Sequence, residues 1–398
     1  MNVQLNDSGV PIIREKTLAQ KIKGFLLWVI LIILTLATAL LVYLCVAGAS
    51  EMNALTTFKQ VSDHPYYTLD YDGYDYTDML NKEPESNDEI VQQCKNKLFT
   101  KPIAMMLPGN AKTEKTVKGS TAFFAKTFIG TYMKGRIYNS YDTPIAMVVS
   151  TPQSGYKSWN IVDMADVGIK SGENVNQWYT NAFQTMAAAY CTSEGINQEG
   201  LSVSLISCPE AECKDTNKVN ITPFMAVRLL LDRAATVQNA VDVLDDYDVI
   251  FSDGTYHLFV SEKIGNSAVI EYIDGEMSVT YMEHTRPGNS HQVCTNKLES
   301  SKASVKDFGD KYSENNLFSY FDNAFYSFEQ GGGGMSQDYA LVLMKKQSEN
   351  YKEVDEEHYG TNRYGTQYIV FYDLDKMQMQ IIIGNDTKNQ SYTYDLTV

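Results

Sequence analysis

A long run without charge near the N-terminus constrains the fold of this chain more than any other feature. From Gly24 to Ser50 no residue is charged, and Phe25 to Val46 is almost continuously apolar. A helix needs roughly 20 apolar residues to cross the hydrocarbon core of a bilayer. The run therefore predicts a transmembrane anchor at residues 24–48.

The charges on either side of this run predict its orientation. The basic residues before it include Arg14, Lys16, Lys21 and Lys23. The first charge after it is Glu51. The positive-inside rule then places a tail of residues 1–23 in the cytoplasm and the main domain outside it. A cleaved signal peptide is the alternative, because Ala47-Gly48-Ala49 resembles a small-residue cleavage pattern, but the run is longer than a usual signal core.

Composition and spacing exclude several partners and cofactors. The formal net charge is −16 and there is no run of lysine and arginine, so no nucleic-acid partner is predicted. The cysteines and histidines show no metal-ligand spacing, and no glycine-rich phosphate loop follows a predicted strand, so no cofactor is predicted. Cys208 and Cys213 are close enough for a small disulfide loop, which a location outside the cytoplasm permits.

Residues 49–119 have the composition of a stalk or pro-segment. Residues 66–78 are rich in tyrosine and aspartate, and residues 81–89 are mostly polar and are interrupted by Pro84. One short helix is expected at residues 90–98. The alternative is a small accessory layer that packs on the main domain.

From Ser120 onward the pattern is strands, then helices, then strands. Strands are predicted at residues 120–128, 132–138, 144–150, 201–206, 256–262, 267–273, 277–282, 368–373, 377–383 and 391–397. Helices are predicted at residues 222–234, from the cap Thr236 through Leu244, at 299–330 and at 336–346. This order predicts an α+β domain of layered antiparallel sheets at residues 120–398.

One stretch within this domain combines a turn with a strand. Gly195 and Gly200 flank a polar turn that holds Asn197, and residues 201–205 then alternate apolar side chains with serine. This alternation is typical of a half-buried strand. The turn is either an ordinary hairpin or a rigid support for an amide beside a cleft.

Several motifs follow one another in an order typical of one family. They are Asn197-Gln198-Glu199-Gly200-Leu201, the helix pair within residues 222–248, Ser267-Ala268-Val269-Ile270-Glu271-Tyr272 with its Asp274-Gly275 turn, and Cys294-Thr295-Asn296. Together they resemble the choloylglycine hydrolase family, which includes bile salt hydrolases, penicillin V acylases and other linear-amide C–N hydrolases. The resemblance covers about residues 120–398. It implies a four-layer αββα N-terminal-nucleophile hydrolase fold behind the transmembrane helix.

The resemblance also implies a set of catalytic residues. Gly135-Arg136-Ile137-Tyr138-Asn139 is similar to the family's Gly-Arg-Asn-x-Asp motif, and 16 residues before Arg136, at the family's cysteine nucleophile, stands Ser120. In such enzymes the free α-amine of the first residue is the general base, so the chain must be cut between Gly119 and Ser120. Asn197 and Asn296 occupy the positions that the resemblance assigns to the oxyanion hole.

This chain departs from the family pattern at three positions. Serine replaces the cysteine, and Asn139 replaces an aspartate that contacts the amine, with Asp142 as a possible substitute nearby. The family's later arginine is missing, since no arginine lies between Arg286 and Arg363. Such changes are typical of a decayed active site.

Two functions follow from these residues. The first is a membrane-anchored hydrolase outside the cytoplasm that cleaves small acyl-amide substrates through Ser120. The second is a catalytically inactive member that binds a ligand or a partner at the cell surface. Cys191-Thr192-Ser193 is a rival nucleophile, although no Gly-Arg motif follows it, and Cys191 is interpreted as a core or disulfide residue.

Overall fold

The computed structural model divides the chain into two compact units, residues 1–49 and residues 50–398. It describes residues 17–47, 49–62, 65–98, 118–169, 181–283, 290–299, 314–331, 333–349, 364–384 and 390–397.

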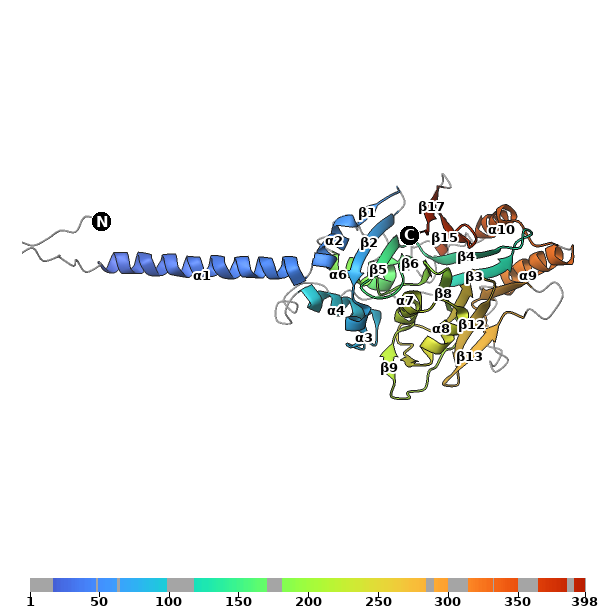
Figure 1. Ribbon diagram of the computed structural model, residues 1–398, viewed down its shortest axis with the longest axis horizontal. Coiled ribbons are helices and arrows are strands. Elements are labelled where there is room, and N and C mark those ends of the chain that lie inside the picture. The colour runs from blue at the N-terminus through green and yellow to red at the C-terminus, as the bar shows by residue number, and fades with distance from the viewer. Residues whose placement is uncertain are drawn as a thin grey trace, which may run out of the picture. The chain divides into compact units, whose positions relative to one another are not determined.

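The first unit contains the helix α1 (Leu18–Ala47), which is drawn in blue in Figure 1. Its segment Leu18–Leu40 has a mean hydropathy of 2.3, and none of its most apolar window is buried. A helix of this length and composition can cross a membrane, and a signal sequence has the same character. The predicted run is thus helical from Gly24 to Ala47, and its most apolar window is exposed.

Two large β-sheets form the centre of the second unit. The first has nine strands in the order β1-β2-β5-β6-β7-β8-β11-β12-β13, and the second has six in the order β14-β3-β4-β15-β16-β17. The strands of the first sheet are β1 (Lys59–Gln60), β2 (Tyr66–Tyr74), β5 (Ile145–Pro152), β6 (Ser158–Asp163), β7 (Glu194–Asn197), β8 (Leu201–Ser207), β11 (Tyr256–Glu262), β12 (Ser267–Ile273) and β13 (Glu276–Tyr281). Those of the second are β14 (His291–Thr295), β3 (Gly119–Lys126), β4 (Tyr132–Tyr141), β15 (Tyr364–Asp373), β16 (Gln378–Ile383) and β17 (Ser391–Asp395). The short strands β9 (Val219–Ile221) and β10 (Tyr247–Val249) pair separately.

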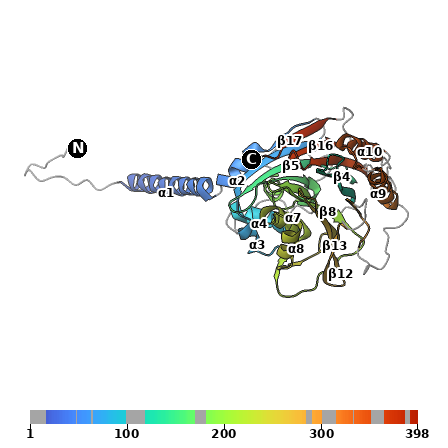
Figure 2. The same ribbon diagram turned by 45° about the vertical axis from the view of Figure 1, so that its right-hand side comes forward.

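Helices cover the outer faces of the two sheets. Against the nine-stranded sheet lie α2 (Ala49–Thr57), α3 (Tyr76–Leu80), α4 (Asn87–Leu98), α6 (Ala182–Ala187), α7 (Pro223–Arg233), α8 (Val237–Leu244) and the 3-10 helix η1 (Met164–Val167). Against the six-stranded sheet lie α9 (Glu314–Gln330) and α10 (Gln337–Glu349), which Figures 1 and 2 show beside β4. The predicted helical region 299–330 is partly observed as α9, and residues 300–313 lie outside the described residues.

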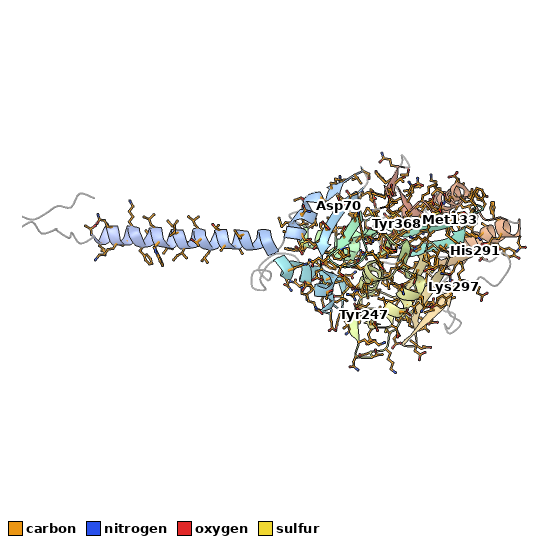
Figure 3. The ribbon with its side chains drawn as sticks, viewed as in Figure 1. Asp70, Met133, Tyr247, His291, Lys297 and Tyr368 are labelled. Atoms are coloured by element: carbon orange, nitrogen blue, oxygen red, sulfur yellow. The ribbon has the colours of Figure 1, made fainter. Side chains whose placement is uncertain are left out.

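The alternation of side chains along β4 determines which of them lie between the two sheets. Tyr138 belongs to the buried cluster between the two sheets, whereas Met133 and Ile137 pack toward α9 and α10. Successive residues of a strand point to opposite faces, so Lys134 and Arg136 also face the other sheet. Figure 3 labels Tyr368, which belongs to the cluster between the sheets, and Met133, which belongs to the cluster under α9 and α10.

The strand β8 is buried on both faces, not on one as its alternating pattern predicted. Leu201, Val203 and Leu205 pack on the helices, and Ser202 and Ser204 are also 0% exposed. The Ser202 hydroxyl shares a 2.8 Å hydrogen bond with the Ser261 hydroxyl, whereas the Ser204 hydroxyl has no partner among the described residues.

The helix pair that the sequence predicts is confirmed, with its caps. Thr222 accepts a hydrogen bond at its hydroxyl from the Met225 amide at 3.2 Å, and Pro223 follows in the first turn of α7. Thr236 caps α8 in the same way, accepting from the Asn239 amide at 3.1 Å. Each cap satisfies an amide that the first turn of a helix leaves without a partner.

The described residues between 50 and 98 belong to the second unit, in agreement with the accessory layer that was the alternative to a stalk. The strand β2 runs parallel to β5 from Tyr66 to Tyr74 and lies inside the nine-stranded sheet. Its tyrosines are buried: Tyr67, Tyr71 and Tyr74 pack on the helices, and Tyr66 packs between the two sheets. The Tyr74 hydroxyl donates to Asp232 at 2.5 Å. This segment is an integral layer of the second unit.

The expected disulfide between Cys208 and Cys213 does not form, since both cysteines are free. The Cys208 thiol instead donates to the Glu210 carbonyl at 3.1 Å. Burial raises the pKa of Cys208 above its ordinary value, as expected for an unreactive structural cysteine.

Candidate active site

Strands β3 and β4 bring Ser120 and Arg136 together. Ser120 pairs with Tyr138 and Ala122 pairs with Arg136, so the arginine lies one pleat along the same face of the sheet. Its Nη2 and Nε atoms donate to the Ser120 hydroxyl at 3.0 Å and 3.3 Å. Both side chains are 1% exposed. A cation so placed stabilises negative charge on the serine oxygen.

Arg136 is held by three further acceptors. Nη1 donates to Glu194 Oε2 at 2.8 Å and to the Ser193 carbonyl at 3.0 Å, and Nη2 donates to the Leu205 carbonyl at 2.6 Å. Burial alone lowers the pKa of Arg136, but Tyr368 and Glu194 outweigh it and raise that pKa above its ordinary value. The guanidinium is therefore a fixed positive charge at Ser120.

Glu194 balances two buried cations. Besides Arg136 it faces the Lys134 amine at 3.6 Å, and it accepts from the Tyr372 hydroxyl at 2.9 Å. Burial lowers the pKa of Lys134 to about 8, although Glu194 acts in the opposite direction. The Lys134 amine has no hydrogen-bond partner in the described part of the chain. Of the two cations, Lys134 has the longer contact with Glu194.

We expect the free energy of unfolding to rise as the pH increases from about 8 to the ordinary lysine value of 10.5. In that range the unfolded chain keeps a proton on Lys134 that the folded chain has released, so a higher pH favours the folded chain. Chemical unfolding of the full-length protein in detergent measures this, with Lys134→Met as the control that lacks the amine. The gain relative to the control is about 3 kcal/mol. An equal pH dependence in both proteins would contradict it.

Asn296 holds the backbone on both sides of the Gly119–Ser120 peptide bond. It follows β14, which pairs with β3. Its Oδ1 accepts from the Ser120 amide at 2.7 Å, and its Nδ2 donates to the Lys118 carbonyl at 2.8 Å. The structure thus brings Asn296 to Ser120, and its oxyanion role stays a prediction.

Asn139 lies opposite Gly119 in the pairing of β3 with β4. Its Oδ1 accepts from the Thr366 hydroxyl at 2.8 Å, and its Nδ2 has no partner among the described residues. This residue is near the start of β3 but carries no charge. Asp142 lies past the end of β4, four residues beyond the Tyr138 that pairs with Ser120.

Asn197 is not brought to Ser120. Its Nδ2 donates to the carbonyls of Leu231 at 3.0 Å and Ala234 at 2.8 Å, at the end of α7. Both N–H groups of the amide are therefore used, and neither is left for an oxyanion. The reason is the parity of β7: Glu194 and Ile196 face the second sheet, so Asn197 faces the helices. The predicted oxyanion role of Asn197 is corrected to a helix-end support.

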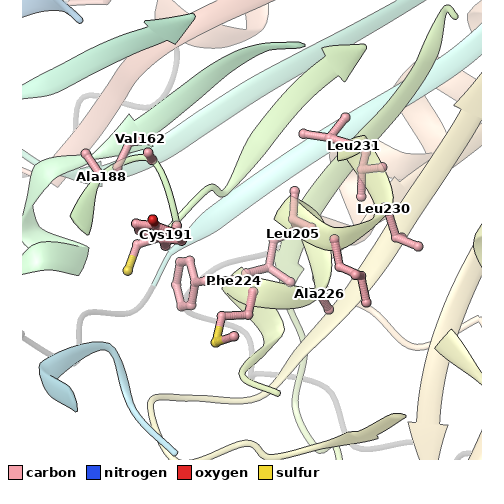
Figure 4. Close-up of a cluster of buried hydrophobic side chains, with 14 of the residues drawn as sticks. Val162, Ala188, Cys191, Leu205, Phe224, Ala226, Leu230 and Leu231 are labelled. Carbon is pink, nitrogen blue, oxygen red and sulfur yellow. The ribbon is translucent and has the colours of Figure 1, made fainter. Parts of the chain in front are cut away.

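Cys191 also lies on the helix side of the nine-stranded sheet. It is 0% exposed, and Figure 4 shows it among Val162, Ala188 and Phe224. Burial raises the pKa of Cys191 well above its ordinary value. A thiol in such surroundings is a poor nucleophile, so the structure favours the interpretation of Cys191 as a core residue.

Glu194 and Lys134 were not predicted from the sequence. A signal was available in β4, where Lys134 and Arg136 alternate with Met133, Gly135 and Ile137 along a predicted strand. Buried cations need a carboxylate partner, and Glu194 begins the strand that carries Asn197. Among the described residues, no group of three or more histidine, cysteine, aspartate or glutamate side chains is arranged to hold a metal ion.

Comparison with known proteins gives matches at the level of sequence family and of structure. A family model described as acyl-coenzyme A:6-aminopenicillanic acid acyl-transferase matches residues 173–388, more than half of the chain. Penicillin V acylase from Pectobacterium atrosepticum is 27% identical over 146 residues, which span 32% of this chain and 37% of that protein. The match therefore covers little more than a third of that relative.

Solved structures of two enzymes are similar to this chain. Penicillin V acylase from Agrobacterium tumefaciens has 15% sequence identity and a TM-score of 0.44, covering 69% of this chain and 86% of its own. A variant of conjugated bile acid hydrolase from Clostridium perfringens has 12% identity and a TM-score of 0.46, covering 69% of this chain and 92% of its own.

Proposed function

Because the chain belongs to the acyl-coenzyme A:6-aminopenicillanic acid acyl-transferase family, we propose that it hydrolyses linear amide C–N bonds through Ser120. The observation that carries this proposal is the pair of hydrogen bonds from Arg136 to the Ser120 hydroxyl, at 3.0 Å and 3.3 Å. The proposal includes an αββα N-terminal-nucleophile fold, anchored by residues 24–48 with the main domain outside the cytoplasm. Its substrates are small acyl amides.

The first step is a cut in the chain itself. The Ser120 oxygen attacks the carbonyl carbon of Gly119 and forms an ester bond to it. The peptide C–N bond between Gly119 and Ser120 breaks, and the Ser120 nitrogen receives the proton of the hydroxyl. The resulting ester is hydrolysed by water to a Gly119 carboxylate and a free Ser120. Arg136 supports the attack by stabilising the developing charge on the serine oxygen, and Asn296 fixes the backbone on both sides of the bond.

The cut produces the general base for the second step. The free α-amine of Ser120 has an ordinary pKa of about 7.7–8.0, so it can accept the hydroxyl proton near neutral pH. The oxygen then attacks the substrate carbonyl, the amine product leaves with that proton, and water releases the acyl group. Asn296 Nδ2, which binds the Lys118 carbonyl before the cut, becomes available to a carbonyl oxygen of the substrate.

The experiment that tests this proposal is an intact-mass measurement. Full-length protein purified in detergent is expected to consist of two polypeptides, one of which begins at Ser120. The cut should accompany hydrolysis of simple N-acyl amides. A single uncut chain contradicts the mechanism, because no α-amine would then exist at Ser120.

A second function, ligand binding without catalysis, is favoured by the neutral Asn139. A carboxylate at that position would hold a protonated amine, and Asn139 offers an amide that already accepts from Thr366. An uncut, folded chain that binds N-acyl amides without hydrolysing them would establish this alternative.

A further inference from the structure

The side chain of Lys118, next to the proposed cut, fills a closed slot. Lys118 is 4% exposed, and its amine forms an ion pair with Asp166 of η1. The amine also lies 5.3 Å from the centre of the Phe224 ring, in the first turn of α7. The slot thus has an acidic end and an aromatic wall, and a buried cation occupies it.

In the described part of the chain, Asp166 has a free acceptor atom besides the one that faces Lys118. Asp166 is 4% exposed, and its Oδ2 has no hydrogen-bond partner among the described residues. Burial raises the pKa of Asp166 to about 7, against the lowering effect of Lys118, and Asp163 raises it further. The Tyr256 phenol also interacts with Lys118. Without Lys118 the buried carboxyl must take up a proton or bind another cation, and an ammonium at the same place would restore the ion pair.

In the proposed cut, the segment that ends at Gly119 is the first substrate of the site. In that reaction the part that ends in Lys118-Gly119 is the acyl group, because Ser120 attacks the Gly119 carbonyl. A later substrate must place its carbonyl carbon at the same point to meet the same oxygen. The group next along its acyl chain then lies where Lys118 lay.

We propose that the Lys118 slot becomes an acyl-group subsite after the cut and selects acyl groups that carry an ammonium the length of a lysine side chain. This inference rests on the proposed function and names its substrate class. Asp166 pairs with the ammonium, and Phe224 contacts it from the side. A neutral group of the same shape leaves the buried carboxylate without a partner, which costs binding.

The test compares two fluorogenic amides with the cut, full-length protein. Lysylglycyl-aminomethylcoumarin carries the ammonium, and norleucylglycyl-aminomethylcoumarin has nearly the same shape without it. The lysyl probe is expected to have a kcat/KM higher by roughly 10- to 100-fold. Asp166→Asn should remove this preference while hydrolysis of the norleucyl probe persists.

A matched control is Asp70→Asn, which neutralises an exposed carboxylate on β2, labelled in Figure 3. It should keep the preference for the lysyl probe. If Asp166→Asn prevents the cut, inhibition of the wild-type enzyme decides: lysylglycine should compete with substrate at least about 10-fold better than norleucylglycine.

The outcomes separate this inference from the proposed function. A cut, active enzyme that prefers neither probe overturns the subsite while the amide hydrolase stands. An uncut chain inert toward all N-acyl amides overturns both. A preference that survives Asp166→Asn in a cut enzyme also overturns the subsite, because the cation would then be recognised elsewhere.

Discussion

Replacing Ser120 with alanine is expected to leave the chain uncut and to lower amide hydrolysis by at least about 10³-fold. The alanine has no oxygen to attack the Gly119 carbonyl, so the α-amine base is not formed either. Arg136 keeps its bonds to Glu194 and to two backbone carbonyls, so the fold should survive. Intact mass, thermal unfolding and hydrolysis of N-acyl amides measure the three effects.

Two variants control this experiment. Ser120→Cys should be cut and active, because a thiol of similar size meets the same Arg136 and serves as a nucleophile. Cys191→Ala should also remain active, because Cys191 packs on the helix side of the sheet. Complete loss of activity in a folded Cys191→Ala protein would move the nucleophile to Cys191.

Replacing Glu194 with glutamine is expected to lower the free energy of unfolding by about 3–5 kcal/mol. The change leaves Arg136 and Lys134, both fully buried, without the carboxylate that balances them. Chemical unfolding of the full-length protein in detergent measures the loss.

The double variant Glu194→Gln with Lys134→Met tests the cause. Removing the second cation should restore part of the lost stability, and Lys134→Met alone should cost far less than Glu194→Gln, because Lys134 has the poorer contact at 3.6 Å. A loss of less than about 1 kcal/mol in Glu194→Gln would show that the charges are not coupled.

Strands and helices around the site could be predicted where their apolar residues repeat with a single clear period. The strands that carry Ser120 and Arg136 and the helix pair from Thr222 have clear apolar patterns and caps, and the structure contains them. The contact between Ser120 and Arg136 follows from the spacing of a tight hairpin, in which residues near the two strand ends face each other. Local rules are enough for such pairs.

The sequence pattern did not predict features that depend on tertiary packing. β2 carries aspartate and tyrosine in a pattern that resembles a polar linker. Its tyrosines are buried only because helices cover one face of the strand and the second sheet covers Tyr66 on the other. The parity of β7 also depends on register: a shift by one residue exchanges Asn197 with its neighbours between the two faces. The motif predicted the strand β8, but it treated residues 194–197 as part of a turn, whereas they form β7, whose pairing with β6 places Glu194 at the site.

The position of β2 in the sheet has a consequence for the product of a cut at Gly119. One polypeptide would contain β2 and the other β5, yet these strands are hydrogen-bonded along Tyr66 to Tyr74. The mature protein would therefore be a non-covalent heterodimer. It should migrate as one particle in a native gel and as two bands after denaturation, and the fragment with the apolar helix would retain the catalytic fragment through a shared sheet.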